Sequence, residues 1–255
     1  MKVVILAGGL GTRLSEETGV KPKPMVEIGG HPILWHIMNI YAHYGYKEFV
    51  IALGYKGYSI KEYFLNHHAM NSNFSIDLFD GKMKFFDKSC YDWKVTLVDT
   101  GELTMTGGRL KRLTPFLENQ PFMLTYGDGV SNVNIRKLVE FHESHGKLMT
   151  ITAVHPKAHY GELEIENNAV LAFKEKPQFK QSWVNGGFMV IQPNCLKYLE
   201  NDETILEREP MEKFVEDAEM AAYQHNGFWQ CMDTLRDMKY LNELWSTGKA
   251  PWMIW

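Results

Sequence analysis

The sequence has few cysteines and no surplus of positive charge, and each absence excludes a class of protein. Its three cysteines, Cys90, Cys195 and Cys231, can form at most one disulfide and show neither a CxxC pair nor the Cys/His spacing of a zinc site. This usage is typical of a protein from a reducing compartment. Lysine and arginine number 27 against 31 aspartates and glutamates, which gives a formal net charge of −4. A general nucleic-acid binder needs a basic surplus, so we expect no nucleic-acid partner.

Long hydrophobic runs are also missing. The N-terminal apolar run, Val3–Ala7, ends at Gly8 and Gly9, whereas a signal peptide needs about 7–15 apolar residues and a membrane helix about 18. The sequence therefore predicts that Val3–Ala7 is the first strand of the mature protein, and that the protein is cytoplasmic with no membrane partner.

The chain has 255 residues, of which 45% are hydrophobic and 23% charged, a balance typical of a globular protein with a core that needs no disulfides. At about 150 residues per domain, the length fits one large domain or a core with an appendage. Short β-branched runs alternate with longer helical patterns, which predicts an α/β fold with a largely parallel sheet. We expect strands at Val3–Ala7, Phe49–Leu53, Trp93–Val98, Phe122–Tyr126, Met149–Val154, Glu162–Ile165, Val170–Phe173 and Gly187–Ile191.

Helices are expected where apolar residues recur at helical spacing. One of them is expected to begin after the N-cap Asn134 and to end at Gly146. The others are expected at Ile33–Tyr44, Ser59–Asn66, Gly107–Leu117, Asn194–Leu199, Pro210–Ala218 and Thr234–Thr247. We expect a single domain over residues 1–255, with a core of about 1–148 and 215–245, a strand-rich part of about 149–214 and an aromatic tail, 245–255, that packs on the domain or contacts another subunit.

A glycine-rich segment, Leu6–Arg13 (LAGGLGTR), directly follows the first expected strand. Glycines allow a sharp turn and let backbone N–H groups approach an anion, and Arg13 adds a fixed positive charge. The spacing matches neither GxGxxG nor GxxxxGK[ST], so the segment lacks both the dinucleotide fingerprint and the P-loop. We interpret it as an anion-binding loop; a tight strand-to-helix turn is the alternative.

The segment Lys21–Pro24 (KPKP) alternates lysine and proline. Its prolines hold the chain extended, so that an ammonium is presented rigidly beside the glycine loop. Such an ammonium suits a phosphate, whereas a solvated loop is the alternative.

Asp128 lies between two glycines in Tyr126–Gly129 (YGDG), at the carboxyl end of an expected buried strand. Ligands bind at this edge of open α/β sheets, and Mg²⁺ in phosphate chemistry takes one or two carboxylates. The motif therefore predicts a metal-binding aspartate, with an ordinary turn residue as the alternative.

Weaker signals occur elsewhere. Thr106–Arg112 (TGGRLKR) opens an expected helix with glycines and basic residues. An anion could bind at this helix start, and an exposed basic helix face is the alternative. Glu175–Pro177 and Asn185–Gly187 offer a charge pair and an amide near strand ends, and either could be an ordinary turn. Asp233 could be a helix N-terminal residue, and the sequence by itself does not pair it with Asp128.

The motifs GGLGTRL, PKP, GDG, EKP and NGG occur in this order, and together they resemble the sugar-1-phosphate nucleotidylyltransferases across most of the chain. Three longer stretches, Ser15–Ile37, Val98–Arg112 and Gly227–Asp237, resemble the branch of that family that transfers a cytidylyl group from CTP to glucose 1-phosphate. The resemblance implies a Rossmann-like nucleotidyltransferase core with a mixed, mostly parallel sheet and a small sugar-binding lobe at about 149–214. It also implies a homo-oligomer, a hexamer, and a product used for the O-antigen of lipopolysaccharide.

The resemblance assigns roles to particular residues. It implies that the catalytic groups are Arg13, Lys23 and Asp128, and that Asp128 and Asp233 hold Mg²⁺. It implies a nucleotide-binding set of Leu6, Ala7, Gly8, Gly9, Gly11, Thr12, Arg13, Thr104, Arg109 and Gly127. It implies a sugar-phosphate-binding set of Lys23, Glu175, Lys176, Asn185 and Gly186.

Other interpretations stay open at this point. A sister enzyme could use another sugar or polyol phosphate, or UTP or dTTP, and His159 and Tyr160 depart from the family pattern near the sugar lobe. A catalytically silent nucleotide-sensing subunit is a second alternative, and a dinucleotide-dependent oxidoreductase a third. Cys231 is a further departure, because the family usually has proline there.

Overall fold

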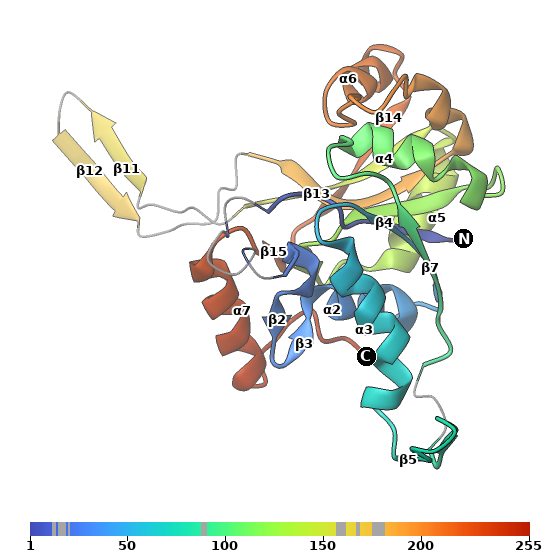
Figure 1. Cartoon of the computed structure of the whole chain (residues 1–255). Helices are drawn as coiled ribbons and strands as arrows, with labels where there is room; N and C mark the ends of the chain where they lie inside the picture. The colour runs from blue at the N-terminus through green and yellow to red at the C-terminus, as the bar shows by residue number, and fades with distance from the viewer. Residues whose placement is uncertain are drawn as a thin grey trace.

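A seven-stranded sheet forms the centre of the molecule (Figure 1). The computed structural model describes residues 1–11, 14, 19, 21–87, 91–156, 162–166, 169–174 and 182–255. Within them the strand order is β14-β10-β13-β8-β1-β4-β7. The strands are β1 (Val3–Leu6), β4 (Glu48–Leu53), β7 (Lys94–Asp99), β8 (Phe122–Tyr126), β10 (Met149–Val154), β13 (Val184–Ile191) and β14 (Met220–His225).

Most neighbouring strands of the sheet run parallel. β1 is parallel to both β4 and β8, β4 is parallel to β7, and β10 is parallel to β14. Only β13 runs antiparallel to its neighbours β10 and β8. The predicted mixed, mostly parallel sheet is confirmed.

Helices cover both faces of the sheet. The α-helices are α2 (Ile33–His43), α3 (Gly57–Met70), α4 (Thr106–Arg112), α5 (Ile135–His145), α6 (Glu209–Glu216) and α7 (Leu235–Ser246), and the short 3₁₀ turns are η2 (Lys23–Met25), η3 (Thr114–Phe116) and η4 (Pro193–Tyr198). The predicted start and end of α5 are confirmed. The Asn134 side chain accepts a hydrogen bond from the Lys137 N–H, and Gly146 ends the helix at a φ of +69°.

The two faces of the sheet belong to two hydrophobic clusters. Alternate residues of a strand point to opposite faces, so Val3 and Ile5 of β1 pack in one cluster, and Val4 and Leu6 pack in the other. The first cluster is closed by residues of α2, α3, α5 and α7, and the second by residues of α4, η4 and α6. A strand buried on both faces has a continuous apolar sequence, which is why β1 could be predicted from the sequence.

In the part of the chain that the structure describes, four small hairpins or paired segments lie outside the main sheet. They are β2–β3 (Glu27–Ile28 with His31–Pro32), β5–β6 (Phe74–Ile76 with Met83–Phe85), β9–β15 (Gly129–Ser131 with Trp229–Cys231) and β11–β12 (Glu162–Glu166 with Ala169–Lys174).

The segment from about 149 to 214, in which we expected a lobe, divides between the core and a projection. β10 and β13 are inner strands of the main sheet, and Cys195, Leu206 and Phe214 are buried in the second hydrophobic cluster. Among the described residues of this segment, the β11–β12 hairpin stands away from the sheet (Figure 1). The shift toward strands after residue 148 suggested a boundary there. The main sheet contains strands from both sides of that position.

The aromatic C-terminal tail packs on the domain, which is one of the two arrangements expected from the sequence. Trp252 is fully buried, and its indole N–H donates to His36 Nδ1 of α2 over 3.3 Å. The other ring nitrogen of His36, Nε2, donates to the Ile28 carbonyl oxygen over 2.9 Å. None of the helices in the described residues is both long enough and apolar enough to cross a lipid bilayer.

Candidate active site

Two loops meet at the carboxyl edge of the sheet, where the chain leaves the neighbouring parallel strands β1 and β8. The chain leaves β1 through Ala7–Gly11 and later leaves β8 through Gly127 and Asp128, and β1 lies between β4 and β8 in the sheet. The Gly127 N–H donates to the Leu6 carbonyl over 3.0 Å, which ties the second loop to the end of β1. In open α/β sheets, the carboxyl edge at such a switch point is where ligands bind.

A pocket of about 300 Å³ opens at this edge. Its lining includes most of the residues for which the sequence suggested nucleotide, phosphate or metal contacts: Leu6, Ala7, Gly8, Gly9, Gly11, Lys23, Thr104, Arg109, Gly127 and Asp128. It also includes four residues to which the sequence analysis gave no individual role: Met105, and Pro24, Thr106 and Tyr126 of the KPKP, TGGRLKR and YGDG motifs. The glycine loop, the KPKP segment and the YGDG turn are thus walls of one pocket.

The guanidinium of Arg109 lies under the glycine loop and is almost fully buried. Its Nη2 donates to the carbonyl oxygens of Gly8 (2.9 Å) and Glu102 (3.0 Å). Its Nη1 donates to the Gly101 carbonyl at 2.7 Å, with the Thr100 hydroxyl and the Leu53 carbonyl also within 3.1 Å. Burial lowers the pKa of Arg109 from its ordinary value. The side chain therefore joins the glycine loop to the ends of β4, β7 and α4.

Glycines make room for this guanidinium. A Cβ at Gly8 would lie 2.2 Å from Arg109 Nη1, and one at Gly54 would lie 2.3 Å from the same atom. Nothing lies within 4 Å of a Cβ at Gly9. Gly8 and Gly54 are therefore required by the close approach of Arg109, whereas Gly9 faces open space.

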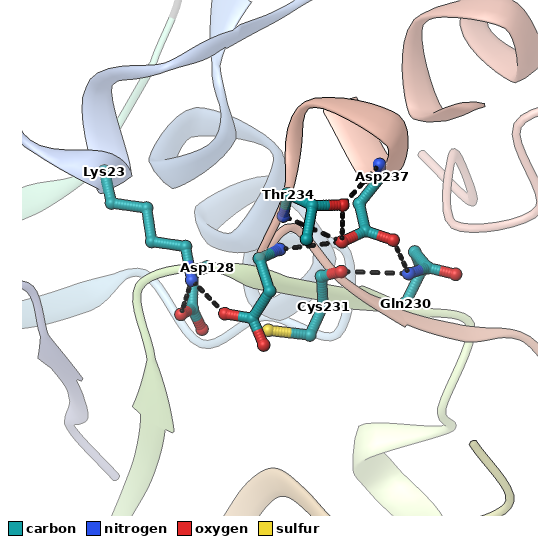
Figure 2. A network of polar contacts seen from close by, with 7 residues as sticks. Lys23, Asp128, Gln230, Cys231, Thr234 and Asp237 are labelled. Atoms are coloured by element: carbon teal, nitrogen blue, oxygen red, sulfur yellow. Dashed lines mark hydrogen bonds and ion pairs between the residues drawn. The ribbon is translucent and has the colours of Figure 1, made fainter. Parts of the chain in front are cut away.

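Lys23, in η2, is buried against two carboxylates (Figure 2). Its Nζ donates to Asp128 Oδ2 over 2.7 Å and to Asp233 Oδ1 over 2.5 Å. Burial by itself would lower the pKa of Lys23, but the charges of Asp128 and Cys231 and the hydrogen bonds to both carboxylates raise it above its usual value. The ammonium therefore stays charged and marks the point where the two carboxylates converge.

The pairing of β9 with β15 brings Asp233 to Asp128. Gly129 of β9 is opposite Cys231 of β15, and the Met232 N–H donates to the Asp128 carbonyl over 2.8 Å. The two aspartates are far apart in the sequence, and their proximity depends on this register. This is the relationship that the sequence by itself could not supply.

Asp237 holds the turn that carries Asp233. Its carboxylate accepts from the Asp233 N–H (3.1 Å), the Thr234 N–H (2.8 Å) and the Thr234 hydroxyl (2.8 Å), and from the Gln230 side-chain amide (3.1 Å). The Thr234 hydroxyl in turn accepts from the Asp237 N–H, which completes a capping box at the start of α7. The sequence analysis did not propose Asp237, although Thr234 and Asp237 have the spacing of that motif.

Asp128, Cys231 and Asp233 form a group that could hold a metal ion. One ligand atom from each lies within 4.8 Å of the others. The donor set fits a divalent cation, because both carboxylates already converge on one positive charge, that of Lys23.

Asn185 and Gly186 are not among the lining residues of the pocket, but Asn185 contacts one of them, Tyr126. The Asn185 amide donates to the Tyr126 hydroxyl over 3.4 Å, and that hydroxyl donates to Glu207 over 2.5 Å. The Gly186 carbonyl accepts from the Trp229 indole N–H over 2.8 Å. Burial and the neighbouring Glu207 charge raise the pKa of Tyr126, so the phenol stays protonated. Asn185 is thus connected to the pocket through a wall residue, Tyr126.

Some predicted site residues lie outside the described residues. These are Thr12, Arg13, Glu175 and Lys176, together with His159 and Tyr160. Thr104, by contrast, is described, is nearly buried and lines the pocket beside Arg109.

The chain is similar to known proteins over its whole length. The sequence profile described as nucleotidyl transferase matches residues 2–238. The sequence is 51% identical over 256 residues to the glucose-1-phosphate cytidylyltransferases of Salmonella typhi and Salmonella typhimurium, covering 100% of this chain and of each relative. The solved structure of HddC from Yersinia pseudotuberculosis covers 96% of this chain and 99% of its own, with a TM-score of 0.70 at 24% identity, and shows the same fold.

Proposed function

Because the chain belongs to the nucleotidyl transferase family, we propose that it transfers a cytidylyl group from CTP to glucose 1-phosphate, giving CDP-glucose and pyrophosphate. The full-length identity of 51% to enzymes named for this reaction carries the proposal. The pocket is consistent with it, since glycine backbone, a buried lysine and two carboxylates converge where a triphosphate could bind.

The nucleotide would bind against the glycine loop. Leu6, Ala7, Gly8, Gly9 and Gly11 line the pocket, and the near absence of side chains there allows a base or a phosphate to approach the backbone closely. In this proposal Thr104 and Gly127 complete the nucleotide site, with Thr12 and Arg13 on the triphosphate. Arg109 stabilises the glycine loop, because its guanidinium donates a hydrogen bond to the Gly8 carbonyl.

The reaction needs alignment and neutralisation of charge more than proton transfer. A phosphate oxygen of the sugar phosphate forms a bond to the α-phosphorus of CTP, and the bond from that phosphorus to pyrophosphate breaks. The nucleophile is already an anion at pH 7, so no general base is required. Lys23 would hold the reacting phosphates and offset their negative charge.

Asp128 and Asp233 would hold a divalent ion, which we propose to be Mg²⁺. When bound, such an ion supplies charge neutralisation at phosphate oxygens. The two carboxylates are oriented for this by the β9–β15 pairing and by the Asp237 capping box.

The sugar phosphate would lie toward Tyr126. Asn185 contacts the lining residue Tyr126, and the Tyr126–Glu207 hydrogen bond fixes the phenol beside Asn185; Gly186 follows Asn185 in the chain. Glu175 and Lys176 would complete this subsite, with Lys23 between the two substrates. A product of this kind would serve O-antigen synthesis.

We also propose that the chain forms a homo-oligomer, through an exposed apolar surface at one end of the molecule. The hairpin surface, as we call it, comprises Leu65, Met70, Phe74, Ile76, Leu78, Phe79, Met83 and Phe86 on α3 and around β5–β6. Leu78 and Phe79 are 88% and 98% exposed. Many exposed apolar side chains in one part of a chain mark an interaction surface, and an isolated two-stranded hairpin is only marginally stable in water.

A second copy of the chain is the occupant that we propose for the hairpin surface. A stable interface buries about 800 Å² per partner, and large aromatic side chains bury about 150–250 Å² each, so eight exposed apolar side chains can supply that area. Substituting Asp for both Leu78 and Phe79 should reduce the sedimentation-derived mass. The matched control is Val215→Asp, which alters an apolar side chain that is 65% exposed on α6. A monomeric parent, or an unchanged oligomer in the double variant, contradicts the proposal.

The catalytic proposal is tested by pyrophosphate release. We expect release with CTP and glucose 1-phosphate in the presence of Mg²⁺, and none when the metal is chelated. Pairing each of CTP, UTP and dTTP with glucose 1-phosphate and with other sugar phosphates separates this enzyme from its sister enzymes. Binding of CTP without any turnover would instead indicate a nucleotide-sensing subunit.

A further inference from the structure

Cys231 lies in the group formed by the two converging aspartates. Its Sγ and one carboxylate oxygen from each of Asp128 and Asp233 lie within 4.8 Å of one another. In Figure 2 the Cys231 sulfur is on the same side of its strand as Lys23 and Asp128. Cys231 therefore offers a third donor atom at the candidate metal site.

The backbone fixes this arrangement. Cys231 is opposite Gly129 in the β9–β15 pairing, which places it one residue from Asp128 across the pair. Residues two apart in an extended segment point to the same side, so Cys231 and Asp233 share one side while the intervening Met232 is fully buried on the other. The same register that brings the two carboxylates together thus brings the sulfur with them.

The donor set differs from one built for a hard cation alone. Mg²⁺ takes oxygen ligands, whereas a thiolate favours Zn²⁺ and other borderline-soft ions. Three protein ligands with a further position left for water or substrate is the arrangement of catalytic zinc sites. The site also attracts positive charge strongly, since two carboxylates bind the Lys23 ammonium at 2.7 and 2.5 Å.

We propose that Asp128, Cys231 and Asp233 together bind a borderline-soft divalent cation such as Zn²⁺ or Co²⁺, with the Cys231 sulfur as a ligand. The sulfur binds as a thiolate, and its proton passes to solvent as the ion enters. Because the same carboxylates are those proposed for Mg²⁺, a bound Zn²⁺ excludes Mg²⁺ and inhibits the enzyme. The inference rests on the metal site of the proposed function, and not on which sugar phosphate or nucleotide the enzyme uses.

Cobalt spectroscopy on the full chain without substrates tests the proposal. Adding Co²⁺ should produce a near-ultraviolet thiolate-to-cobalt charge-transfer band that saturates at one equivalent. Cys231→Ser should abolish the band and weaken Co²⁺ binding at least tenfold. Cys195→Ser should retain the band, because Cys195 is buried in the second hydrophobic cluster, away from the site. Circular dichroism checks that each variant is folded.

Two results overturn the inference: no charge-transfer band in the folded parent, or an unchanged band in folded Cys231→Ser. As a second readout, Zn²⁺ should compete with Co²⁺ and remove the band in the parent. Failure of the proposed function is recognised separately, because the spectrum needs no substrate. An enzyme that shows the band but releases no pyrophosphate contradicts the cytidylyltransferase proposal alone.

Discussion

The ammonium nitrogen of Lys23 lies 2.7 Å from a carboxylate oxygen of Asp128, although 105 residues separate the two in the sequence. Lys23 begins the buried turn η2, and Asp128 follows the end of β8. Both residues line the pocket, and their contact joins the KPKP segment to the YGDG turn. The site is therefore built by a sheet edge that collects short loops, and the charges that matter are few and local. This explains how a chain with a net charge of −4 can offer a site for polyanions.

Replacing Lys23 with alanine should reduce turnover at least about a hundredfold, the effect of removing one charge-stabilising group from an active site. The variant should fold, as circular dichroism can show. Lys47→Ala is the matched control, because it removes another Lys–Asp pair, the exposed one with Asp92 at 2.8 Å. Equal turnover in the two variants would contradict the role given to Lys23.

Alanine at Gly8 should destabilise the protein by about 1–3 kcal/mol, as overpacking does. Its Cβ would lie 2.2 Å from Arg109 Nη1, and the guanidinium cannot move without losing hydrogen bonds to several backbone carbonyls. Gly9→Ala should change the free energy of unfolding by less than about 0.5 kcal/mol, since its Cβ would meet nothing within 4 Å. Denaturant unfolding measures both, and similar losses would argue against the Arg109 contact as the cause.

Asp237→Ala should lower both stability and turnover. Loss of a helix cap costs about 1 kcal/mol, and the turn that orients Asp233 loses the carboxylate that accepts its N–H. Asn134→Ala provides a comparison, because it removes the cap of α5, which lies outside the pocket lining. Both variants should lose stability, whereas only Asp237→Ala should lose turnover. Full turnover in a folded Asp237→Ala variant would show that Asp233 needs no such support.

His36 should make the protein sensitive to acid. Burial lowers its pKa from 6.5 to about 4, so the unfolded chain binds a proton there between these values while the native state does not. The free energy of unfolding is unaffected by this group above pH 6.5. It decreases as the pH falls from 6.5 to about 4, by about 3 kcal/mol in total.

The variant His36→Gln should flatten the dependence of the unfolding free energy on pH between 6.5 and 4, measured by denaturant titration. His43→Gln, on the exposed side of the same helix, should leave the slope unchanged. His142, whose pKa burial also lowers to about 4, contributes equally to the parent and both variants. Parallel curves for His36→Gln and the parent would contradict this account.

The buried centre of the fold was readable from the sequence because strands covered on both faces are continuous apolar runs. This holds for β1 and β8, whose expected bounds match the structure to within a residue. β14 was not predicted, since it is an edge strand whose residues are only partly buried or exposed. The short β9–β15 pairing carries no such pattern, and it needs partners about a hundred residues apart.

The candidate site, too, could be predicted only in part from the sequence. Each loop motif could be recognised in the sequence, because glycine, proline and a flanking charge are local signals. The edge of the sheet brings these motifs together in one pocket. The contact between Lys23 and Asp233 was not visible, because it depends on the β9–β15 register. The burial of Arg109 among backbone carbonyls was not visible either, since the sequence shows a basic helix but not the loops packed over it.

Pyrophosphate release with CTP and glucose 1-phosphate tests the central claim most directly. We predict Mg²⁺-dependent release that is fastest for this pair among CTP, UTP and dTTP combined with glucose 1-phosphate and other sugar 1-phosphates. A folded protein that releases no pyrophosphate with this pair, or that clearly prefers another nucleotide or sugar phosphate, would contradict the claim.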